Sequence, residues 1–407
     1  MRNKSVVCIV LVSMLPAVRA AEIQVNTRTS GSQANPAVAV DAAGGSVVVW
    51  SSYFTTSGRS NDILARRLDP VGGFAGGEFL VNAMIEGNQT EPAVATDRNG
   101  GFAVAWQGPG LDQEDIFLRL FDPNGRPTTD ELLVNSRTAG RQLYPSIARN
   151  DGTLILTWES REVVADVNRI FVYAQVFEPN SAALHKEIAP DATTYDCRYP
   201  HVAVDGTGRF AVVWMQDRSN HPVMARLYDP NGVPATDALQ VNAESITSLT
   251  RPSIAMNSLG YFVVAWDGDP NHASDDDIYA RLYDPNGRPG GEPFVVNTIR
   301  TGAQRWPQVA INDTNEFVIV WEHDTGDPNA ATDIFARRFD GEGRPIGDQF
   351  QINTYTQSRQ RYPDVGVAAD GSFVATWESQ GQDGASYGVF AHVAPAIVAS
   401  DANSAGP

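Results

Sequence analysis

The stretch Pro92–Trp106, PAVATDRNGGFAVAW, is the unit from which most of this chain is built. It consists of an apolar run that opens with Pro, a turn rich in Asp, Asn and Gly, and a second apolar run that closes with Trp. Variants of the unit occur seven times, and their closing residues are Trp50, Trp106, Trp158, Trp214, Trp266, Trp321 and Trp377. A period of about 54 residues is typical of a repeat architecture.

Each repeat contains four short segments with the composition of strands. In the second repeat these are Pro92–Thr96, Phe102–Trp106, Ile116–Phe121 and Glu131–Val134. They are rich in Val, Ile, Phe, Leu and Ala, and turns such as Asp122–Gly125 (DPNG) between them suit tight hairpins. No segment shows a sustained helical period. Four antiparallel strands in each of seven repeats predict an all-β fold, a seven-bladed β-propeller.

The two ends of the repeat region complement each other. The last repeat supplies three strands and no fourth, whereas Glu22–Asn26 (EIQVN) matches the fourth strands seen elsewhere, such as Phe294–Asn297. We therefore expect the N-terminal strand to complete the last blade and close the ring, which leaves no unpaired edge. An open solenoid or tandem sandwiches would not explain this match. The third repeat is the least regular, because Lys186–Pro190 (KEIAP) replaces its fourth strand, and its blade is expected to be the most distorted.

The N-terminus has the pattern of a secretory signal peptide. Arg2 and Lys4 precede the apolar run Val6–Leu15, and Val18-Arg19-Ala20 offers small residues for cleavage after Ala20. The predicted organisation is a signal peptide over 1–20, the propeller over 21–394 and a disordered tail over 395–407. The predicted location is outside the cytoplasm: periplasmic, extracellular or on the cell surface. Cys197 would then be the remaining cysteine, which excludes an intramolecular disulfide and fits a bacterial protein.

Charge argues against two classes of partner. The chain has 48 acidic against 30 basic residues and a net charge of −18. Such a balance gives no attraction to phosphate backbones or anionic membranes, so nucleic-acid binding is not expected. Membrane insertion is not expected either, because no segment after the N-terminal apolar run approaches the roughly 20 apolar residues of a spanning helix. The oligomeric state is left open.

The long loops of every repeat are expected on one face of the propeller. Because strand direction alternates, the short hairpins of turns one and three share one face, and the long, variable turns two and four share the other. Binding residues usually accumulate on such variable loops.

Turn four carries a recurring set of polar and aromatic residues just before the strand-opening Pro. Amides, guanidinium groups and aromatic faces recognise sugars and carboxylates, so these residues are the candidate ligand-binding site around the central opening. The alternative is structural, with the amides capping backbone and the aromatic rings packing between blades. The candidates are Gln33, Gln89, Gln142, Gln304, Gln360, Arg198, Arg251, Arg305, Arg361, Tyr199, Trp306 and Tyr362, and Tyr144 occupies the same position.

Carboxylates offer two further hypotheses. Glu159, Glu322 and Glu378 directly follow the repeat Trp, and a pair of them at the mouth of the long-loop face is the alternative, catalytic site for glycoside cleavage. Turn two is acidic, and Asp275, Asp276 and Asp277 are its candidate metal ligands, although solvated loops are the simpler interpretation. No cofactor is predicted, with Ca²⁺ as the alternative.

The repeat resembles a known bacterial family. Val-Asn-Thr at 25–27 and 296–298, Gly-Gly-Phe-Ala-Val-Ala-Trp at 100–106 and Trp-Glu-Ser-Gln-Gly-Gln-Asp-Gly at 377–384 carry the resemblance. They are similar to the VNT/GGFVVxW repeats of about 54 residues in large bacterial secreted and surface proteins. The resemblance implies an architecture and a compartment, and no particular activity.

The function favoured at this point is a secreted, non-catalytic module that binds a glycan or surface polymer on the long-loop face. Near-identical repeats suit several similar binding sites better than one irregular pocket. The first alternative is a carbohydrate-active hydrolase or lyase that uses carboxylates at the mouth of that face, so whether the protein is an enzyme stays open. The second is a purely structural surface or adhesin-type module.

Overall fold

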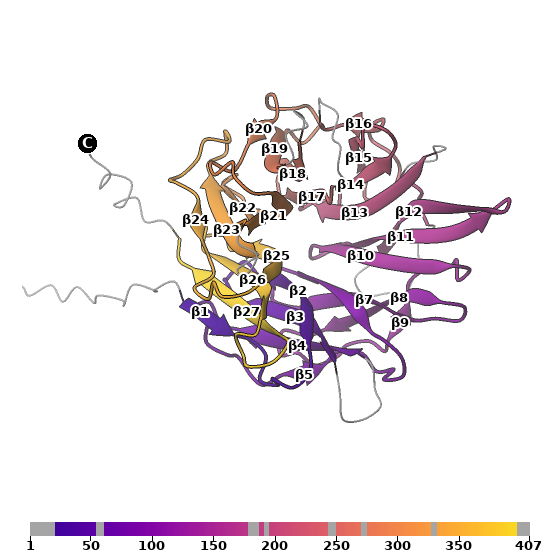
Figure 1. Cartoon of the computed structure of the whole chain (residues 1–407). Coiled ribbons are helices and arrows are strands. Elements are labelled where there is room, and N and C mark those ends of the chain that lie inside the picture. The colour runs from indigo at the N-terminus through magenta and orange to yellow at the C-terminus, as the bar shows by residue number, and fades with distance from the viewer. Residues whose placement is uncertain are drawn as a thin grey trace, which may run out of the picture.

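The protein is a ring of seven antiparallel β-sheets around a central channel (Figure 1). The computed structural model describes residues 21–53, 61–177, 187–190, 195–242, 250–269, 275–326 and 332–396. Within these ranges every regular element is a strand, and no helix is long and apolar enough to cross a membrane. The predicted seven-bladed β-propeller is confirmed.

Each blade places the strand that contains or directly follows the repeat Pro innermost, and the Trp-containing strand next to it. The innermost strands are β2 (Gln33–Val40), β6 (Thr90–Thr96), β10 (Arg141–Arg149), β13 (Asp196–Val204), β17 (Ser253–Met256), β21 (Gln304–Ile311) and β25 (Gln360–Val367). The second strands are β3 (Ser46–Tyr53), β7 (Phe102–Pro109), β11 (Leu154–Val164), β14 (Phe210–Asp217), β18 (Phe262–Gly268), β22 (Phe317–Asp324) and β26 (Phe373–Gln380).

In six blades the outer half is a full third strand and a short fourth, and the sheet of the third blade ends with its third strand. The third strands are β4 (Asn61–Leu68), β8 (Glu114–Phe121), β12 (Val167–Phe177), β15 (Val223–Tyr228), β19 (Asp277–Tyr283), β23 (Thr332–Phe339) and β27 (Tyr387–Ala394). The outermost are β1 (Ala21–Gln24), β5 (Phe79–Leu80), β9 (Leu132–Leu133), β16 (Leu239–Gln240), β20 (Phe294–Val295) and β24 (Phe350–Gln351).

The hydrophobic core is divided into clusters that each join two neighbouring blades. Trp158 of the third blade, for example, packs in one cluster with Ala105 and Ile116 of the second. The seven repeat tryptophans are all buried, the most exposed of them at 3%. The burial of so large an apolar ring at every junction stabilises the contact between neighbouring blades.

The ring closes through the N-terminal strand, as predicted. β1 pairs antiparallel with β27, with Ile23 opposite Ala391. Val25 is fully buried in a cluster that combines last-blade residues with Trp50 of the first blade. Arg66 of the first blade also donates from Nη1 to the carbonyl oxygen of Val25 at 2.7 Å. The last blade therefore contains both ends of the propeller chain, and no open edge remains between it and the first.

The third blade differs from the others in the described part of the chain. Its sheet has three strands, and Ile188 alone pairs with Ala174 where a fourth strand would lie. Lys186, the first residue of the irregular segment noted in the sequence, lies outside the described residues. So do the predicted signal peptide and all of the predicted tail after Ala396.

Candidate functional site

A β-bulge at the start of the innermost strands turns one side chain per blade towards the channel. The strand register shifts between Leu143 and Ser146, across Tyr144 and Pro145, and the same shift recurs in five other blades. The residue before Pro has a positive φ at Asn35, Glu91, Tyr144, Tyr199, Trp306 and Tyr362. This conformation is uncommon for a residue with a side chain, and bulges serve to redirect side chains.

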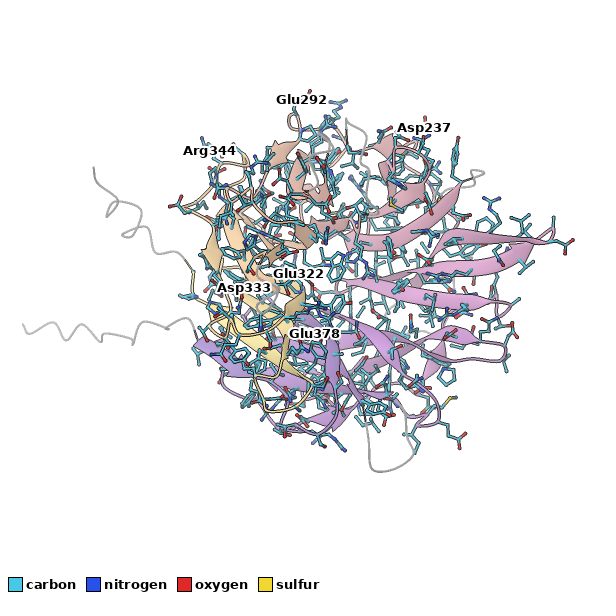
Figure 2. All side chains as sticks on the ribbon, in the orientation of Figure 1. Asp237, Glu292, Glu322, Asp333, Arg344 and Glu378 are labelled. Atoms are coloured by element: carbon cyan, nitrogen blue, oxygen red, sulfur yellow. The ribbon has the colours of Figure 1, made fainter. Side chains whose placement is uncertain are left out.

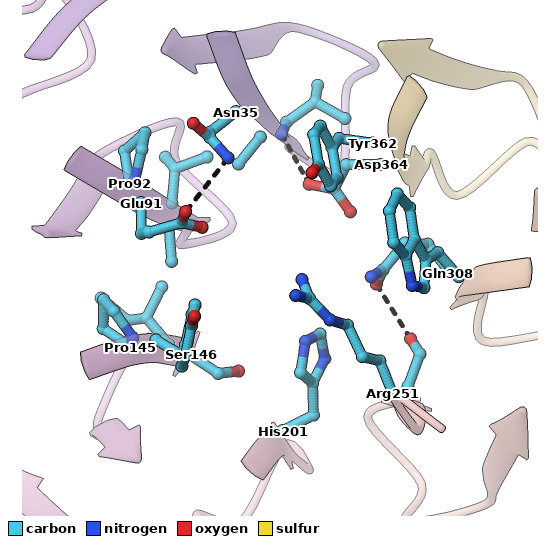
Figure 3. Close-up of a pocket in the computed structure, with 18 of the residues that line it drawn as sticks. Asn35, Glu91, Pro92, Pro145, Ser146, His201, Arg251, Gln308, Tyr362 and Asp364 are labelled. Atoms are coloured by element: carbon cyan, nitrogen blue, oxygen red, sulfur yellow. Dashed lines mark hydrogen bonds between the residues drawn. The ribbon is translucent and has the colours of Figure 1, made fainter. Parts of the chain in front are cut away.

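The seven residues before Pro form the wall of one cavity at the long-loop end of the channel. The cavity has a volume of about 310 Å³ (Figure 3). We call these residues the mouth ring; they are Asn35, Glu91, Tyr144, Tyr199, Arg251, Trp306 and Tyr362. Every blade contributes one of them, so the cavity exists only because the ring is closed.

Aromatic side chains form most of the mouth ring. Trp306 and Tyr362 are stacked with ring centroids 4.8 Å apart, and Tyr144 and Tyr199 are tilted at 5.8 Å. The guanidinium carbon of Arg251 lies 4.8 Å from the ring of Tyr199, 5.3 Å from that of Trp306 and 5.6 Å from that of Tyr144. Cation–π contacts of this kind hold the arginine between the two aromatic pairs.

Polar side chains lie among the Pro, Ala, Val and Ile residues that form the rest of the cavity wall. The side-chain amide of Asn35 donates to Glu91 at 3.2 Å, and burial raises the pKa of Glu91, opposed by the charge of Arg251. Burial, assisted by the same arginine, lowers the pKa of His201 to about 4. Burial also raises the pKa of Asp364 to about 7, although its carboxylate accepts the N–H of Val38 at 2.8 Å. Neutral imidazole, phenol and carboxyl groups are therefore present together near pH 7.

The five predicted glutamines lie inside the blades and do not line the cavity. Each accepts a hydrogen bond from the indole N–H of the Trp in its own blade, at 2.9 to 3.1 Å. All are at most 1% exposed. They are Gln33, Gln89, Gln142, Gln304 and Gln360. A buried indole N–H needs an acceptor, so this position has a structural use in every blade that carries it.

Three of the four predicted arginines already have a carboxylate partner. Arg198 bonds Asp217 at 3.0 Å, Arg305 bonds Asp276 at 3.0 Å, and Arg361 bonds Glu378 at 2.9 Å. Arg251 differs, because among the residues that the structure describes it forms no ion pair and no hydrogen bond through its side chain. It is also the one predicted arginine that lines the cavity.

The three predicted catalytic glutamates are buried beneath the mouth ring. Glu322 accepts the backbone N–H of Tyr362 at 2.6 Å, Glu378 that of Asn35 at 3.1 Å, and Glu159 that of Tyr199 at 3.4 Å. Each bond joins one blade to the next. Figure 2 shows Glu322 and Glu378 near the centre of the ring, whereas Glu292 lies at its rim.

The surroundings of Glu322 and Glu378 favour the protonated form. Burial raises the pKa of Glu322 to about 8, and the negative charge of Glu378 adds to this effect. Burial raises the pKa of Glu378 to about 7, opposed by Arg361. In the second blade Gln107 takes the same role and accepts the N–H of Tyr144 at 3.0 Å. An amide cannot act as an acid, so at this repeat position the inter-blade bond is the shared function.

The predicted metal candidates bind protein groups. Asp276 pairs with Arg305, and Asp277 pairs with Arg300 and accepts from Asn297 at 2.6 Å. Asp275 is exposed. Across the described ranges no group of three or more His, Cys, Asp or Glu side chains is arranged to hold a metal ion. The Ca²⁺ alternative stays a prediction, with no support from these three residues.

Four cavity residues were missed by the sequence analysis. Asn35 and Glu91 directly precede the strand-opening Pro, as the aromatic residues do. Their repeat position could therefore have identified them from the sequence. His201 and Asp364 directly follow the strand-opening Pro and line the cavity one step deeper. Neither belongs to a motif, and only the bulge brings them beside the mouth ring.

Comparisons with known proteins identify the fold and no family. No family model matches the chain, and no curated protein matches it. Among solved structures it resembles a polysaccharide lyase, an ulvan lyase bound to -[GlcA(1-4)Rha3S]-, with a TM-score of 0.57 and 10% identity over 95% of this chain and 100% of the other. It also resembles a Penicillium chrysogenum α-L-arabinanase complexed with arabinobiose, with a TM-score of 0.52 and 13% identity over 79% and 99%. A protein of unknown function from Dyadobacter fermentans has a TM-score of 0.55 and 9% identity over 94% and 100%.

These likenesses correct the function favoured by the sequence. A non-catalytic binding module was placed first, and that prediction is wrong, because the solved structures of this fold include a polysaccharide lyase and an arabinanase. They favour the alternative, a carbohydrate-active hydrolase or lyase. The glycans bound in both structures agree with a glycan as the kind of partner. At such low identity the likeness to these enzymes is one of fold alone.

Proposed function

We propose that the protein is a polysaccharide-cleaving enzyme whose substrate lies across the mouth ring. One observation carries this proposal: four aromatic rings and an arginine surround a single cavity on the long-loop face. Aromatic faces stack on the apolar faces of sugar rings, and a few polar groups then fix the orientation of the sugar. A volume of about 310 Å³ is at the lower end of what pockets for small ligands have, which suits a sugar unit or two of a longer chain.

The same cavity contains groups that can move protons. Cleavage of a glycosidic linkage needs a proton donor for the departing oxygen and a base for the other proton transfer. Tyr144, Tyr199 and Tyr362 offer hydroxyl groups, Glu91 a carboxyl group of raised pKa, and His201 an imidazole that is neutral at pH 7. These groups support a catalytic function more directly than Glu159, whose carboxylate is fully buried and bonded to Arg161.

A hydrolase that uses Glu322 and Glu378 is the second candidate. It is favoured by their adjacent positions and by their pKa values of about 8 and 7, since a glycoside hydrolase needs a protonated carboxyl group beside a second carboxylate. Against it, both are at most 5% exposed and bonded to backbone N–H groups.

The test is polysaccharide turnover by the purified protein. Neutral and anionic polysaccharides are incubated with it, and new chain ends are measured. We expect cleavage of at least one polymer, and we expect Trp306→Ala and Tyr362→Ala to lower kcat/KM by about 10-fold or more, because each removes a stacking face. Tyr261→Ala is the matched control, because Tyr261 is 41% exposed on the hairpin between β17 and β18, at the opposite face. Failure to cleave any polymer would contradict the proposed function.

We also propose that the protein is secreted and belongs with the VNT/GGFVVxW repeats of bacterial secreted and surface proteins. The charged and apolar pattern of residues 1–20 supports secretion, and the motifs at 25–27, 100–106 and 377–384 support the relationship. N-terminal sequencing of the protein recovered outside the cytoplasm should begin at Ala21. An N-terminus that retains Arg2 and Lys4 would contradict cleavage.

A further inference from the structure

Arg251 is the arginine in the mouth ring, and its side chain is held in place without being neutralised. In the described part of the chain its guanidinium group contacts three aromatic rings and has no ion-pair or hydrogen-bond partner. Figure 3 shows it projecting into the cavity, with Glu91 on the opposite side. Glu91 acts on Arg251 only through its charge, since its own hydrogen bond is with Asn35.

The lack of a carboxylate partner distinguishes Arg251 from the other three predicted arginines. Acidic residues outnumber basic ones by 48 to 30, and Arg198, Arg305 and Arg361 all have carboxylate partners. A guanidinium group has five N–H donors in a planar fork, which binds carboxylates in bidentate fashion. Stacking between Tyr199 and Trp306 fixes the plane of that fork and leaves its donors available to a ligand. The arrangement is that of a preorganised anion receptor.

We propose that the substrate is a polyuronate, that Arg251 binds the carboxylate of the sugar unit in the cavity, and that the linkage is broken by β-elimination. This inference rests on the proposed function and names its substrate class. A hydrolase would need two free carboxyl groups facing the sugar, whereas Glu322 and Glu378 are engaged in bonds between blades. Elimination needs one cation for the substrate carboxylate and groups that accept and donate a proton, all of which line this cavity.

The elimination step requires no further reactant. Arg251 neutralises the uronate carboxylate, which makes the proton on the adjacent C5 more acidic. A base in the cavity takes that proton, the electrons of the C5–H bond form a double bond between C4 and C5, and the bond from C4 to the linking oxygen breaks. That oxygen receives a proton from an acid in the cavity and leaves as the end of the other chain fragment. Water is not consumed, and one product carries an unsaturated uronate.

Tyr199 and Tyr144 are the hydroxyl groups best placed for these proton transfers. Their rings lie 4.8 and 5.6 Å from the guanidinium carbon of Arg251, so both residues lie beside the group that would bind the carboxylate. His201, two residues after Tyr199, also lines the cavity and is the third candidate. Near pH 7 its imidazole is neutral and can accept a proton.

The experiment compares polymers that differ in charge. The full chain is given polygalacturonate, polymannuronate and a glucuronate-containing polymer, next to a sulfated galactan and a neutral β-glucan. We expect cleavage of at least one uronate polymer, with new ultraviolet absorbance from the unsaturated product. Methyl esterification of the same polymer removes the carboxylate charge and should abolish cleavage. Cleavage of the sulfated galactan alone would assign the anion to a sulfate ester and overturn the uronate assignment.

Arg251→Gln is the decisive variant. It removes the charge but keeps most of the side chain, and we expect it to lower kcat/KM on the uronate polymer by at least about 100-fold. Arg251→Lys, which keeps the charge without the fork, should recover part of the loss. Arg288→Gln is the matched control, since Arg288 is exposed on the hairpin after β19 of the same blade and on the opposite face.

The outcomes separate this inference from the proposed function. Reducing ends without unsaturated product, or equal cleavage of the neutral β-glucan by the parent and Arg251→Gln, would overturn the polyuronate assignment while leaving a polysaccharide-cleaving enzyme. Cleavage of no polymer would contradict both. Calorimetric titration of the polyuronate into each variant gives a second readout. Binding as tight to folded Arg251→Gln as to the parent would also overturn the assignment.

Discussion

At the residue scale, the same repeat position carries chemically different side chains in different blades. The residue after the repeat Trp is Gln107 in the second blade and Glu322 in the sixth, and both accept a backbone N–H from the next blade. The carboxyl group costs stability when it ionises there, because it is almost fully buried. The burial that positions Glu322 for its hydrogen bond to the next blade thus also leaves a titratable carboxyl group beneath the cavity.

The pH dependence of stability should report on Glu322. Its pKa is raised to about 8 in the folded protein from an ordinary value of 4.5, so the folded state holds the proton more tightly between these pH values. Stability should therefore fall as pH rises from about 5 towards 8, and Glu322→Gln should remove Glu322's share of this fall, on the order of 3 kcal/mol between pH 5 and pH 8.

Urea unfolding of the parent and Glu322→Gln at pH 5 and pH 8 measures this effect. Glu378, Asp267 and Asp364, with pKa values of about 7, titrate in the same window and remain in both proteins. The difference between the two proteins therefore reports Glu322 together with its charge repulsion with Glu378. An unchanged pH slope in the variant would contradict the buried, protonated state.

At the element scale, the Val-Asn or Ile-Asn sequence of six of the seven blades connects the outer two strands. Asn135 accepts the N–H of Ile116 at 2.8 Å and donates to Asp115 at 2.7 Å, and equivalent bonds join Asn82 with Asp62. A fourth strand of two residues has few ladder bonds of its own. The buried amide therefore supplies the connection that a longer strand would have made.

Replacing this amide should release β9 from β8. We expect Asn135→Leu to lower the free energy of unfolding by about 2 to 3 kcal/mol, because it leaves the N–H of Ile116 and the carboxylate of Asp115 without their partner. Chemical denaturation measures the change. Asn124→Leu, at an exposed turn position of the same blade, is the control and should change stability by less than about 0.5 kcal/mol. Equal effects of the two substitutions would show that the amide is not a connecting element.

At the scale of the whole molecule, the closure between β1 and β27 holds the cavity together. The mouth ring takes one residue from each blade, so an opening between the last and first blades would separate Tyr362 from Asn35. Stability of the closure and formation of the site are therefore linked.

A charge buried at the closure should open the ring. Val25 is fully buried, and we expect Val25→Asp to destabilise the protein by more than about 3 kcal/mol, because an unpaired carboxylate would enter an apolar cluster. Thermal unfolding, with light scattering to detect exposed strand edges, measures the effect. Val71→Asp is the control, since Val71 is 59% exposed. A melting temperature within a few degrees of the parent for Val25→Asp would contradict a closure that depends on β1.

The sequence itself determined the fold of this protein. Alternating apolar runs and Asp/Gly turns are local signals, and a sevenfold repeat of them can be counted without coordinates. The closure of the ring could also be predicted from the sequence, because Glu22–Asn26 resembles the strand that the last repeat lacks. The sequence further identified the repeat position from which the mouth ring is built.

Only the tertiary structure decided which residues at that position are available to a ligand. Gln142 and Gln304 bond the indole of their own blade, and Arg305 is neutralised by Asp276. Arg251 contacts aromatic rings and has no carboxylate partner among the residues that the structure describes. The physical reason is that these partners belong to strands and blades whose distances are set by sheet pairing and ring closure. A repeat pattern specifies equivalent positions, and the contacts across the ring determine what each of them can do.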